Sequence, residues 1–368
     1  MATHTDILII GGGIAGIGAA ARLADIANVT VLEREKALGY HSTGRSAAIF
    51  IKNYGNSIVR TLNAASEPEL VQPDLVSDFS LLSPRGEMLI ACEEDMAALD
   101  AYLDDAEDME RLTPKEAGEL VPILNTERLA GAAIERGAQE IDVDRLLQGY
   151  VRLSRTRGVK IVIDTRVTGL SRNSGQWIVQ TPRDSFVAPV VINAAGAWAD
   201  DIAHKAGLAP LGLQGLRRSA ALIPAPEGHD TSIWPLFAAA SEGFYAKPDA
   251  GHLMVSPADE DPVEPHDVWA DDMVLAEGLH RYEQAVNVPV TRILHNWAGL
   301  RTFAPDRIPV VGFDPREDGF FWLAGQGGYG IQTAPALSRL TANLIAETTP
   351  GLARHVVAAL SPNRLLKG

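Results

Sequence analysis

Residues 5–46 read TDILIIGGGIAGIGAAARLADIANVTVLEREKALGYHSTGRS and contain two short apolar segments joined by glycines and a run of alanines. The first segment, Ile7–Ile10, is too short for a buried helix and rich in β-branched residues, which predicts a buried parallel strand. The second segment, Val29–Leu32, is similar and ends at Glu33. Three glycines in the spacing G-x-G-x-x-G follow the first segment: Gly11, Gly13 and Gly16. A strand–glycine–helix–strand unit of this kind predicts a dinucleotide-binding site; the alternative is a glycine-rich turn without a ligand.

Each glycine has a separate expected role. Gly11 permits the tight turn from strand to helix, and Gly13 lets a pyrophosphate approach the backbone because it has no Cβ. Gly16 lets the helix pack closely on the strand.

The start of the predicted helix and the acid after the second strand complete this unit. The free N–H groups around Ile14 and Ala15, together with the helix dipole, are expected to hold the phosphates. Glu33 is expected to accept hydrogen bonds from a ribose diol, which favours a cofactor without a 2′-phosphate.

Composition narrows the class of protein. The chain has 368 residues, enough for about two domains, and a formal net charge of −15, which argues against nucleic acid as a partner. Its single cysteine, Cys92, excludes an intrachain disulfide and favours a reducing compartment. There is no cysteine cluster for a metal, no signal peptide pattern and no apolar run long enough for a membrane span. We therefore expect a soluble, cytoplasmic enzyme without a metal.

The segment after Glu33 ends in HSTGRSAA, residues 41–48. Its hydroxyl groups, on Ser42, Thr43 and Ser46, are typical of a second anion-binding turn, with Arg45 as a counter-charge. The alternative is an ordinary polar loop.

Two later segments repeat the junction of a strand, small residues and a helix. The apolar run Val187–Ile192 leads into NAAGAW, residues 193–198. The strand expected at Phe320–Ala324 leads into GQGGYG, residues 325–330, before a helix expected at Thr333–Thr348. Small residues at such junctions indicate that a ligand passes close to the backbone.

Other segments alternate in polarity and suggest an antiparallel sheet. Residues 79–91, Leu213–Ile223 and Gly243–Ser256 predict short strands, whereas Glu93–Leu120 is acidic and predicts helix. Thr165–Leu170 is also expected to be a strand. The predicted fold is mixed α/β, with a Rossmann-like parallel-sheet domain and an interleaved antiparallel-sheet substrate domain. The expected division assigns residues 1–78, 141–205 and 296–368 to the first domain and residues 79–140 and 206–295 to the second.

Several remote glycine-rich junctions fit a long, fully buried dinucleotide such as FAD better than a nicotinamide cofactor. At GGGIAG, VLEREKALGYHSTGRSA, NAAGAW, WAGLR and GQGGYGIQTAPA, the chain resembles the D-amino-acid oxidase and glycine oxidase superfamily. Within that superfamily, the closest resemblance is to the FAD-dependent D-arginine dehydrogenases, and it runs nearly end to end.

The resemblance implies FAD held without a covalent link. Besides the residues above, it implies contacts from the loop after the second strand and from the two later junctions. These residues are Arg34, His41, Ser42, Thr43, Gly44, Ser46, Ala47, Val167, Ala195, Gly196, Trp198, Gly325, Gly327, Gly328, Tyr329, Gly330, Ile331 and Gln332.

The resemblance also implies a substrate site. Arg301 is the first candidate for binding a carboxylate, since a planar guanidinium binds a carboxylate through two hydrogen bonds. Arg218 matches a second arginine, although its neighbour Arg217 could face inward instead. Tyr54 and Tyr245 match tyrosines that face the substrate.

Two further positions bear on specificity. By resemblance, Glu87 faces the substrate side chain, which predicts a preference for basic D-amino acids. The family pattern reads GRSAAH, with a pocket histidine, whereas this chain reads GRSAAI and has Ile49 there. A titratable group is thus replaced by an apolar one.

The expected reaction is oxidation of a D-amino acid by hydride transfer from Cα to flavin N5, followed by hydrolysis of the imino acid to a 2-oxo acid and ammonia. The electron acceptor is expected to be a quinone or a dye rather than oxygen. One alternative is oxidation of a secondary amine, such as sarcosine, D-proline or D-hydroxyproline, or of a 2-hydroxy acid. Another is an FAD-bound subunit without catalysis.

Overall fold

The structure, a computed structural model, describes residues 2–366 and is built around a six-stranded sheet. All its strands run parallel except β21, which pairs antiparallel with β22. In spatial order the strands are β10 (Lys160–Val162), β3 (Val29–Leu32), β2 (Ile7–Ile10), β14 (Val190–Asn193), β22 (Phe320–Ala324) and β21 (Val310–Phe313).

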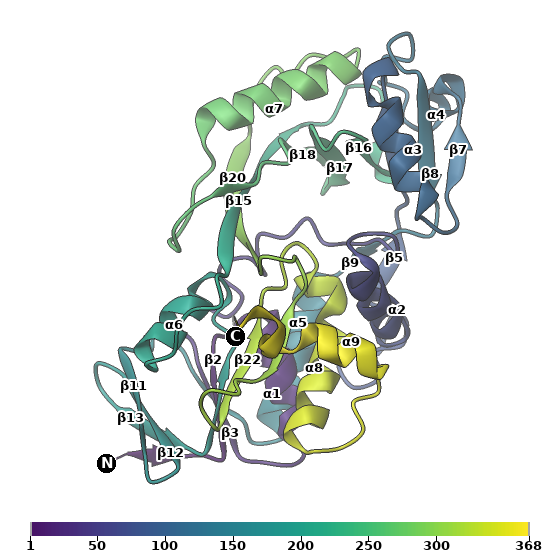
Figure 1. The fold of residues 1–368 in the computed structure, drawn as a ribbon. Helices are drawn as coiled ribbons and strands as arrows, with labels where there is room; N and C mark the ends of the chain where they lie inside the picture. Colours follow the sequence, from purple (N-terminus) through teal and green to yellow (C-terminus); the bar gives the residue numbers. More distant parts are fainter. Residues whose placement is uncertain (1, 367–368) are drawn as a thin grey trace.

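Both faces of this sheet are covered, which explains why its central strands are continuously apolar. On β2, Ile7 and Ile9 belong to one hydrophobic cluster, whereas Leu8 and Ile10 belong to another. The first cluster lies under the helices α1 (Ile14–Leu23), α5 (Val143–Thr156) and α8 (Gly330–Ile345), and α2 (Ser57–Val71) packs on α8. The C-terminal helix α9 (Arg354–Leu360) and the 3₁₀ turn η4 (Pro362–Leu365) follow (Figure 1).

The second cluster is covered by a four-stranded sheet and by α6 (Ala199–Lys205), which follows the 3₁₀ turn η2 (Gly196–Trp198). Its strands, in order, are β1 (Thr3–His4), β13 (Ser185–Ala188), β12 (Gln176–Gln180) and β11 (Gly169–Asn173).

A second lobe, uppermost in Figure 1, contains a larger sheet. Its main path is β19 (Asp261–Pro262), β15 (Gln214–Pro224), β18 (His252–Ser256), β17 (Tyr245–Asp249), β16 (Leu236–Ala239), β6 (Glu87–Ala91), β8 (Gly131–Glu135) and β7 (Glu110–Leu112), and β20 (His295–Phe303) pairs with β15. The pairs are antiparallel except β16 with β6. The helices of this lobe are α3 (Met96–Asp104), α4 (Pro114–Leu120) and α7 (Asp272–Ala285), with 3₁₀ turns η1 (Glu93–Asp95) and η3 (Thr231–Ile233).

A small sheet joins the lobes in the order β4 (Ile49–Phe50), β9 (Gln139–Ile141) and β5 (Leu82–Pro84). The predicted mixed α/β fold, with one parallel and one antiparallel sheet, is confirmed. The domain boundaries stay a prediction; the expected boundary at residues 295 and 296 lies at the start of β20, which pairs along its length with β15.

Four predicted elements were wrong in detail. The run Val187–Ile192 is split by Pro189, which has no N–H for a ladder, so β13 and β14 belong to different sheets. The strand expected at Thr165–Leu170 begins only at Gly169, since Thr165 donates its N–H to the carbonyl of Glu33, 2.8 Å away.

The segment Glu93–Leu120 contains two helices separated by β7 rather than continuous helix, and Asp108, between them, has a φ of 56°. The last predicted helix begins at Gly330, three residues earlier than expected. Among residues 2–366, no helix combines the length and apolarity that crossing a bilayer requires.

Candidate functional site

Three adjoining cavities extend from the ends of the central parallel strands toward the second lobe. The first encloses about 420 Å³ and is lined by residues of the nucleotide-binding unit. The second, of about 150 Å³, shares Gly13, Ser42 and Thr43 with the first. The third, of about 440 Å³, shares Arg218 and Arg301 with the second. The site therefore connects the predicted cofactor residues with the predicted substrate residues.

Glu33 is held at the end of β3 beside the first cavity. Its Oε2 accepts a hydrogen bond from the N–H of Gly12, 2.6 Å away, and its Oε1 accepts one from the N–H of Glu35 at 2.8 Å. These donors fix the direction of the carboxylate, whose remaining lone pairs are available to a diol.

The three glycines of the G-x-G-x-x-G motif differ in what surrounds them. A Cβ on Gly11 would lie 2.2 Å from the carbonyl oxygen of Ala194, and its φ is +117°. A Cβ on Gly16 would lie 2.0 Å from the carbonyl oxygen of Gly11. On Gly13, by contrast, a Cβ would meet only the Thr43 hydroxyl, at 3.3 Å. Thus Gly11 and Gly16 allow backbone segments to pack, whereas Gly13 leaves space beside the cavity.

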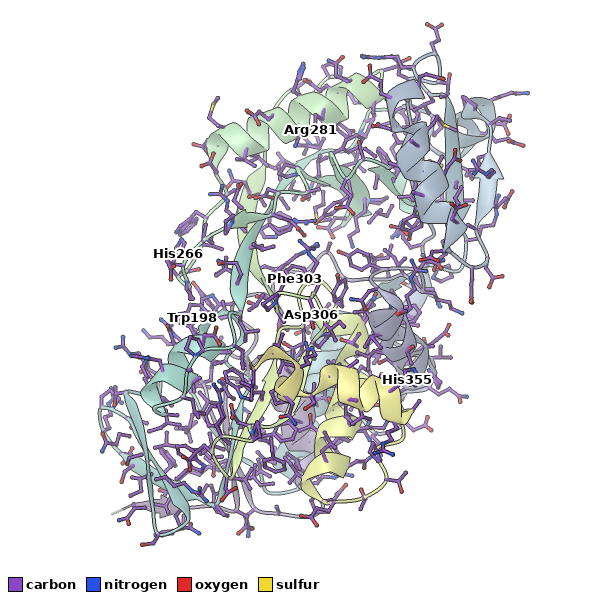
Figure 2. The ribbon with its side chains drawn as sticks, viewed as in Figure 1. Trp198, His266, Arg281, Phe303, Asp306 and His355 are labelled. Atoms are coloured by element: carbon purple, nitrogen blue, oxygen red, sulfur yellow. The ribbon has the colours of Figure 1, made fainter. Side chains whose placement is uncertain are left out.

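Aromatic and charged side chains form one wall of the first cavity. Cζ of Arg34 lies 4.6 Å from the ring centroid of Trp198, and the ring centroid of His41 lies 4.7 Å from that of Trp198, which is labelled in Figure 2. His41 Nε2 is 3.0 Å from Glu35 Oε1. Val167, Ala195 and Gly196 also line this cavity.

The serine-rich loop is anchored by its own hydrogen bonds. Ser42 Oγ donates to the carbonyl of Leu300 at 2.6 Å, and Thr43 Oγ1 accepts the N–H of Ile14 at 3.1 Å. Arg45 donates to the carbonyls of Ala298 and Val268 and to Asp267. These bonds fasten the loop to the second lobe, and Arg45 also lines the second cavity, so its role as a counter-charge stays a prediction.

The second cavity runs along the C-terminal glycines. Its walls include Ala15, Ser46, Ala47, Gly327, Gly328, Gly330 and Ile331, and it ends at the N-terminus of α8. A Cβ on Gly327 would lie 2.2 Å from the ring of Phe303, which lies where the lobes meet (Figure 2). A Cβ on Gly328 would lie 3.0 Å from both Arg301 Nη1 and Tyr54 Oη. The glycines therefore permit close contact between α8 and the arginine.

Three predicted cofactor residues line none of these three cavities: Gly16, Gly44 and Gly325. Gly44 closes a turn, with its N–H donating to Gly39 at 2.8 Å. Gly325 has a φ of +72° beside the backbone of Ala304. These glycines therefore shape the backbone around the site and do not line the cavities themselves.

All six predicted substrate-site residues line the third cavity: Ile49, Tyr54, Glu87, Arg218, Tyr245 and Arg301. Arg301 Nη1 donates to Tyr54 Oη at 3.1 Å. Tyr329 packs against Tyr54, with ring centroids 5.0 Å apart, and Gln332 lines the same cavity. Residues from both ends of the chain thus meet in one site, although their roles stay predictions.

The two neighbouring arginines of β15 point in different directions because side chains alternate along a strand. Arg218 lines the cavity and donates to the carbonyl of Asp259 at 2.8 Å and to Glu260 Oε1 at 3.0 Å. Arg217 forms ion pairs with Asp259, Asp261 and Asp271. Arg218 is therefore the arginine available to a ligand.

The charged groups around Arg301 and Arg218 shift the pKa values of the side chains beside them. Burial opposes ionisation of Tyr245, but the guanidiniums of Arg301 and Arg218 favour it, and the pKa of Tyr245 is lowered. Burial also opposes the charge of Arg301, yet Tyr54, Tyr245 and Glu260 hold the pKa of Arg301 above its usual value. The site is thus strongly cationic where the second and third cavities meet.

The carboxyl group of Glu87 also lines the third cavity. Glu87 is 7% exposed, and burial followed by the charge of Glu135 raises the pKa of Glu87 to about 8. Tyr102 and Asn53 line the same cavity. Sequence reasoning missed Tyr102 and Glu260, which line this cavity, and Glu135, which lies opposite Glu87, because only strand pairing and tertiary packing bring them there.

A sequence profile described as "DAO: FAD dependent oxidoreductase" matches residues 6–344. The chain belongs to this FAD-dependent oxidoreductase family.

Among curated relatives, this oxidoreductase is 24% identical over 364 residues to the glycine oxidase of Geobacillus kaustophilus, covering 93% of each chain. It is 27% identical over 409 residues to the sarcosine oxidase subunit beta of Rhizobium meliloti, covering 99% of this chain and 89% of that one.

Among solved structures, the Geobacillus kaustophilus glycine oxidase superposes with a TM-score of 0.86 at 23% identity, covering 98% of this chain and 99% of the other. The L-proline dehydrogenase of P. horikoshii superposes with a TM-score of 0.82 at 21% identity, covering 99% and 98%. These likenesses establish the fold.

FAD is the cofactor of this oxidoreductase, and the residues present fit it. Gly13 leaves room for a pyrophosphate, and Glu33 ends β3 beside the first cavity. The amide nitrogens of Gln326 and Gln332 are buried and have no hydrogen-bond partner among residues 2–366. Gln326 lines the second cavity and Gln332 the third, so both can donate to polar atoms of a flavin or substrate.

Proposed function

We propose that this flavoprotein oxidises D-amino acids with basic or long side chains to imino acids, acting as a dehydrogenase. The observation that carries the proposal is the grouping of Arg301, Arg218, Tyr54 and Tyr245 where the second cavity opens into the third. The preference for the D-enantiomer rests on the sequence resemblance.

The arginines are suited to hold the substrate carboxylate. Arg301 is held in position by its hydrogen bond to Tyr54. Arg218 is held by its hydrogen bonds to Glu260 and to the backbone carbonyl of Asp259. Guanidiniums held in this way bind a carboxylate with little loss of side-chain entropy. Tyr245, whose ring centroid is 5.9 Å from Cζ of Arg218, adds a hydroxyl group to the same wall.

The residues proposed to line the flavin are the C-terminal glycines and the N-terminus of α8. Bound FAD would itself accept the hydride that leaves Cα. The N–H groups at the start of α8 favour negative charge near them. Tyr329, which is 6% exposed, and Tyr54 cover this region and limit the access of water before the imino acid is released.

The part of the third cavity that Glu87 lines is proposed to receive the substrate side chain. Glu87 can pair with a guanidinium or ammonium group there. Leu89, Leu236 and Ala238 add apolar walls to the same cavity, which also suits long uncharged side chains.

Oxidation of a secondary amine is the second candidate. Two relatives are named for sarcosine and proline, and Ile49 and Ile51 give the third cavity apolar groups that an N-alkyl substituent could contact. Under this candidate Glu87 has no partner in the substrate.

Anaerobic mixing of the holoenzyme with single candidate substrates tests the proposal. The panel contains D- and L-arginine, D- and L-methionine, D-proline, sarcosine and glycine. D-Arginine and D-methionine are expected to bleach the oxidised flavin spectrum. Reduction by sarcosine or D-proline alone would favour the second candidate, and reduction by L-enantiomers alone would contradict the first.

The electron acceptor is tested separately. After reduction, a quinone or an artificial dye is expected to restore the oxidised spectrum faster than dissolved oxygen does. Faster recovery with oxygen would make the protein an oxidase instead of a dehydrogenase.

A further inference from the structure

Two carboxylates lie on neighbouring strands beside the third cavity, and one of them, that of Glu87, lines it. Glu87 begins β6, Glu135 ends β8, and the antiparallel register places them directly opposite each other. Directly opposed side chains share a face of the sheet, with Cβ atoms about 5 Å apart, and like charges at such positions are destabilising. Both residues are buried, at 7% and 2% exposure.

The two carboxylates have unequal hydrogen bonding. Glu135 accepts the N–H of Lys52 at 2.9 Å, the N–H of Asn53 at 3.4 Å and Asn53 Nδ2 at 2.6 Å. Glu87 Oε2 is buried and has no partner among residues 2–366, although its side chain lines the cavity. Three donors favour negative charge on Glu135, so the proton of the pair belongs on Glu87.

The other ionisable groups described near Glu87 do not act as its counter-ion. They are Tyr102 of α3, Arg60 of α2, Lys52 and Tyr54 after β4, and Glu242 between β16 and β17. Arg60 donates to the carbonyls of Gly55 and Asp105, and Lys52 Nζ pairs with Glu67 at 2.9 Å. Both cations are therefore engaged elsewhere.

We infer that Glu135 is a specificity-determining positioning residue: its fixed charge keeps a proton on Glu87, a cationic side chain binds by displacing that proton to solvent, and an uncharged side chain binds with the proton retained. This inference rests on the proposed function and deepens it. One site would thereby accept both long apolar and long cationic D-amino acids.

The electrostatics agree with this arrangement. Burial and Glu135 raise the pKa of Glu87 to about 8, so Glu87 is mainly neutral at pH 7. Since the cation must displace one proton, its apparent affinity falls about tenfold for each pH unit below that pKa. A neutral side chain carries no such penalty.

Infrared spectroscopy of the holoenzyme without substrate tests whether the carboxyl group of Glu87 carries a proton. The carbonyl stretch of a protonated carboxylic acid is assigned to Glu87 by its loss in Glu87→Gln. In the wild type we expect this signal at pH 7 and a midpoint of its loss near pH 8. Its absence from the wild type at pH 7 would overturn the inference.

Variants of Glu135 test the cause. In Glu135→Gln, the midpoint of the Glu87 signal is expected to fall by about one pH unit or more, because the opposing charge is gone. Glu135→Asp keeps the charge and should restore the wild-type midpoint. Glu110→Gln, which removes an exposed carboxylate from β7, is the control and should not move it. An unchanged midpoint in Glu135→Gln would contradict the role of Glu135.

Kinetics link the proton to specificity. The ratio of KM for D-arginine to KM for D-methionine cancels the titration of the shared α-ammonium group. In the wild type this ratio should fall about tenfold per unit as the pH rises from 6 toward 8. In Glu135→Gln the ratio should be about tenfold smaller than in the wild type at the same pH, because the pKa of Glu87 is lower, with kcat little changed. An equal ratio in both proteins at the same pH would overturn the inference.

The two proposals fail in different ways. If no D-amino acid reduces the flavin, the proposed function fails, whereas the infrared signal still decides whether Glu135 holds the proton on Glu87. If Glu135→Gln does not fold, the wild-type signal and Glu135→Asp still decide it.

Discussion

Arg217 and Arg218 are adjacent in sequence, yet the structure gives them different surroundings. Arg217 is neutralised by three aspartates, whereas Arg218 lines the second and third cavities. The sequence motif LRRSA leaves the choice between them open, because strand alternation requires only that they differ. Glu260 and the register of β15 determine which one faces the cavity.

Conservative changes at these two arginines form a matched pair. Arg218→Lys is expected to raise KM for the amino acid about tenfold to a hundredfold, because an ammonium cannot reproduce the two-pronged geometry of a guanidinium. Arg217→Lys should change KM less than about threefold, since its carboxylate partners lie outside the cavity. Steady-state kinetics with D-arginine measure both. Equal losses in the two variants would contradict the placement of Arg218.

At the scale of elements, the nucleotide-binding unit was predictable almost completely. Strand, glycines, helix and Glu33 follow from local pattern, and β2, α1 and β3 occur where the sequence places them, with α1 beginning at Ile14. Prediction failed where packing decides. Pro189 separates two strands that read as one apolar run, and Glu135 lies opposite Glu87 only because β8 pairs with β6.

Two glycines of this unit should separate stability from cofactor binding. Gly11→Ala forces a Cβ against the backbone of Ala194 at a φ of +117°, and we expect it to lower the free energy of unfolding by about 2 kcal/mol or more. Gly13→Ala has an ordinary φ of −79° and meets only Thr43. It should lower the stability of the apoprotein by less than about 1 kcal/mol and weaken FAD affinity at least about tenfold.

Chemical denaturation of the apoproteins and fluorescence titration with FAD measure the two effects. A Gly13→Ala protein with wild-type FAD affinity would contradict the assignment of the pyrophosphate site to the space beside Gly13.

Over the whole molecule, the cofactor site connects both lobes. The loop carrying Ser42 and Arg45 bonds to Leu300 and Ala298 of β20, and Glu260 pairs with both Arg218 and Arg307. Residues lining the three cavities come from both the six-stranded and the larger sheet. The cofactor is therefore expected to stabilise segments that are distant in sequence.

Hydrogen exchange of the apoprotein and holoprotein tests this coupling. FAD should slow exchange in residues 33–47, 165–167 and 326–332, which include the cavity linings, because a ligand that binds only the folded state stabilises it. Helices α7 and α3 should change little at their solvent-facing turns. Protection confined to residues 5–33 would show that the cofactor does not extend to the C-terminal glycines.

The most direct test of the central claim is anaerobic stopped-flow reduction of the wild-type holoenzyme by D-arginine and by L-arginine. The structure and the resemblance together predict loss of the oxidised flavin absorbance with D-arginine, at a rate that saturates with concentration, and no comparable loss with L-arginine. Flavin that stays oxidised with D-arginine and with every other D-amino acid would contradict the account.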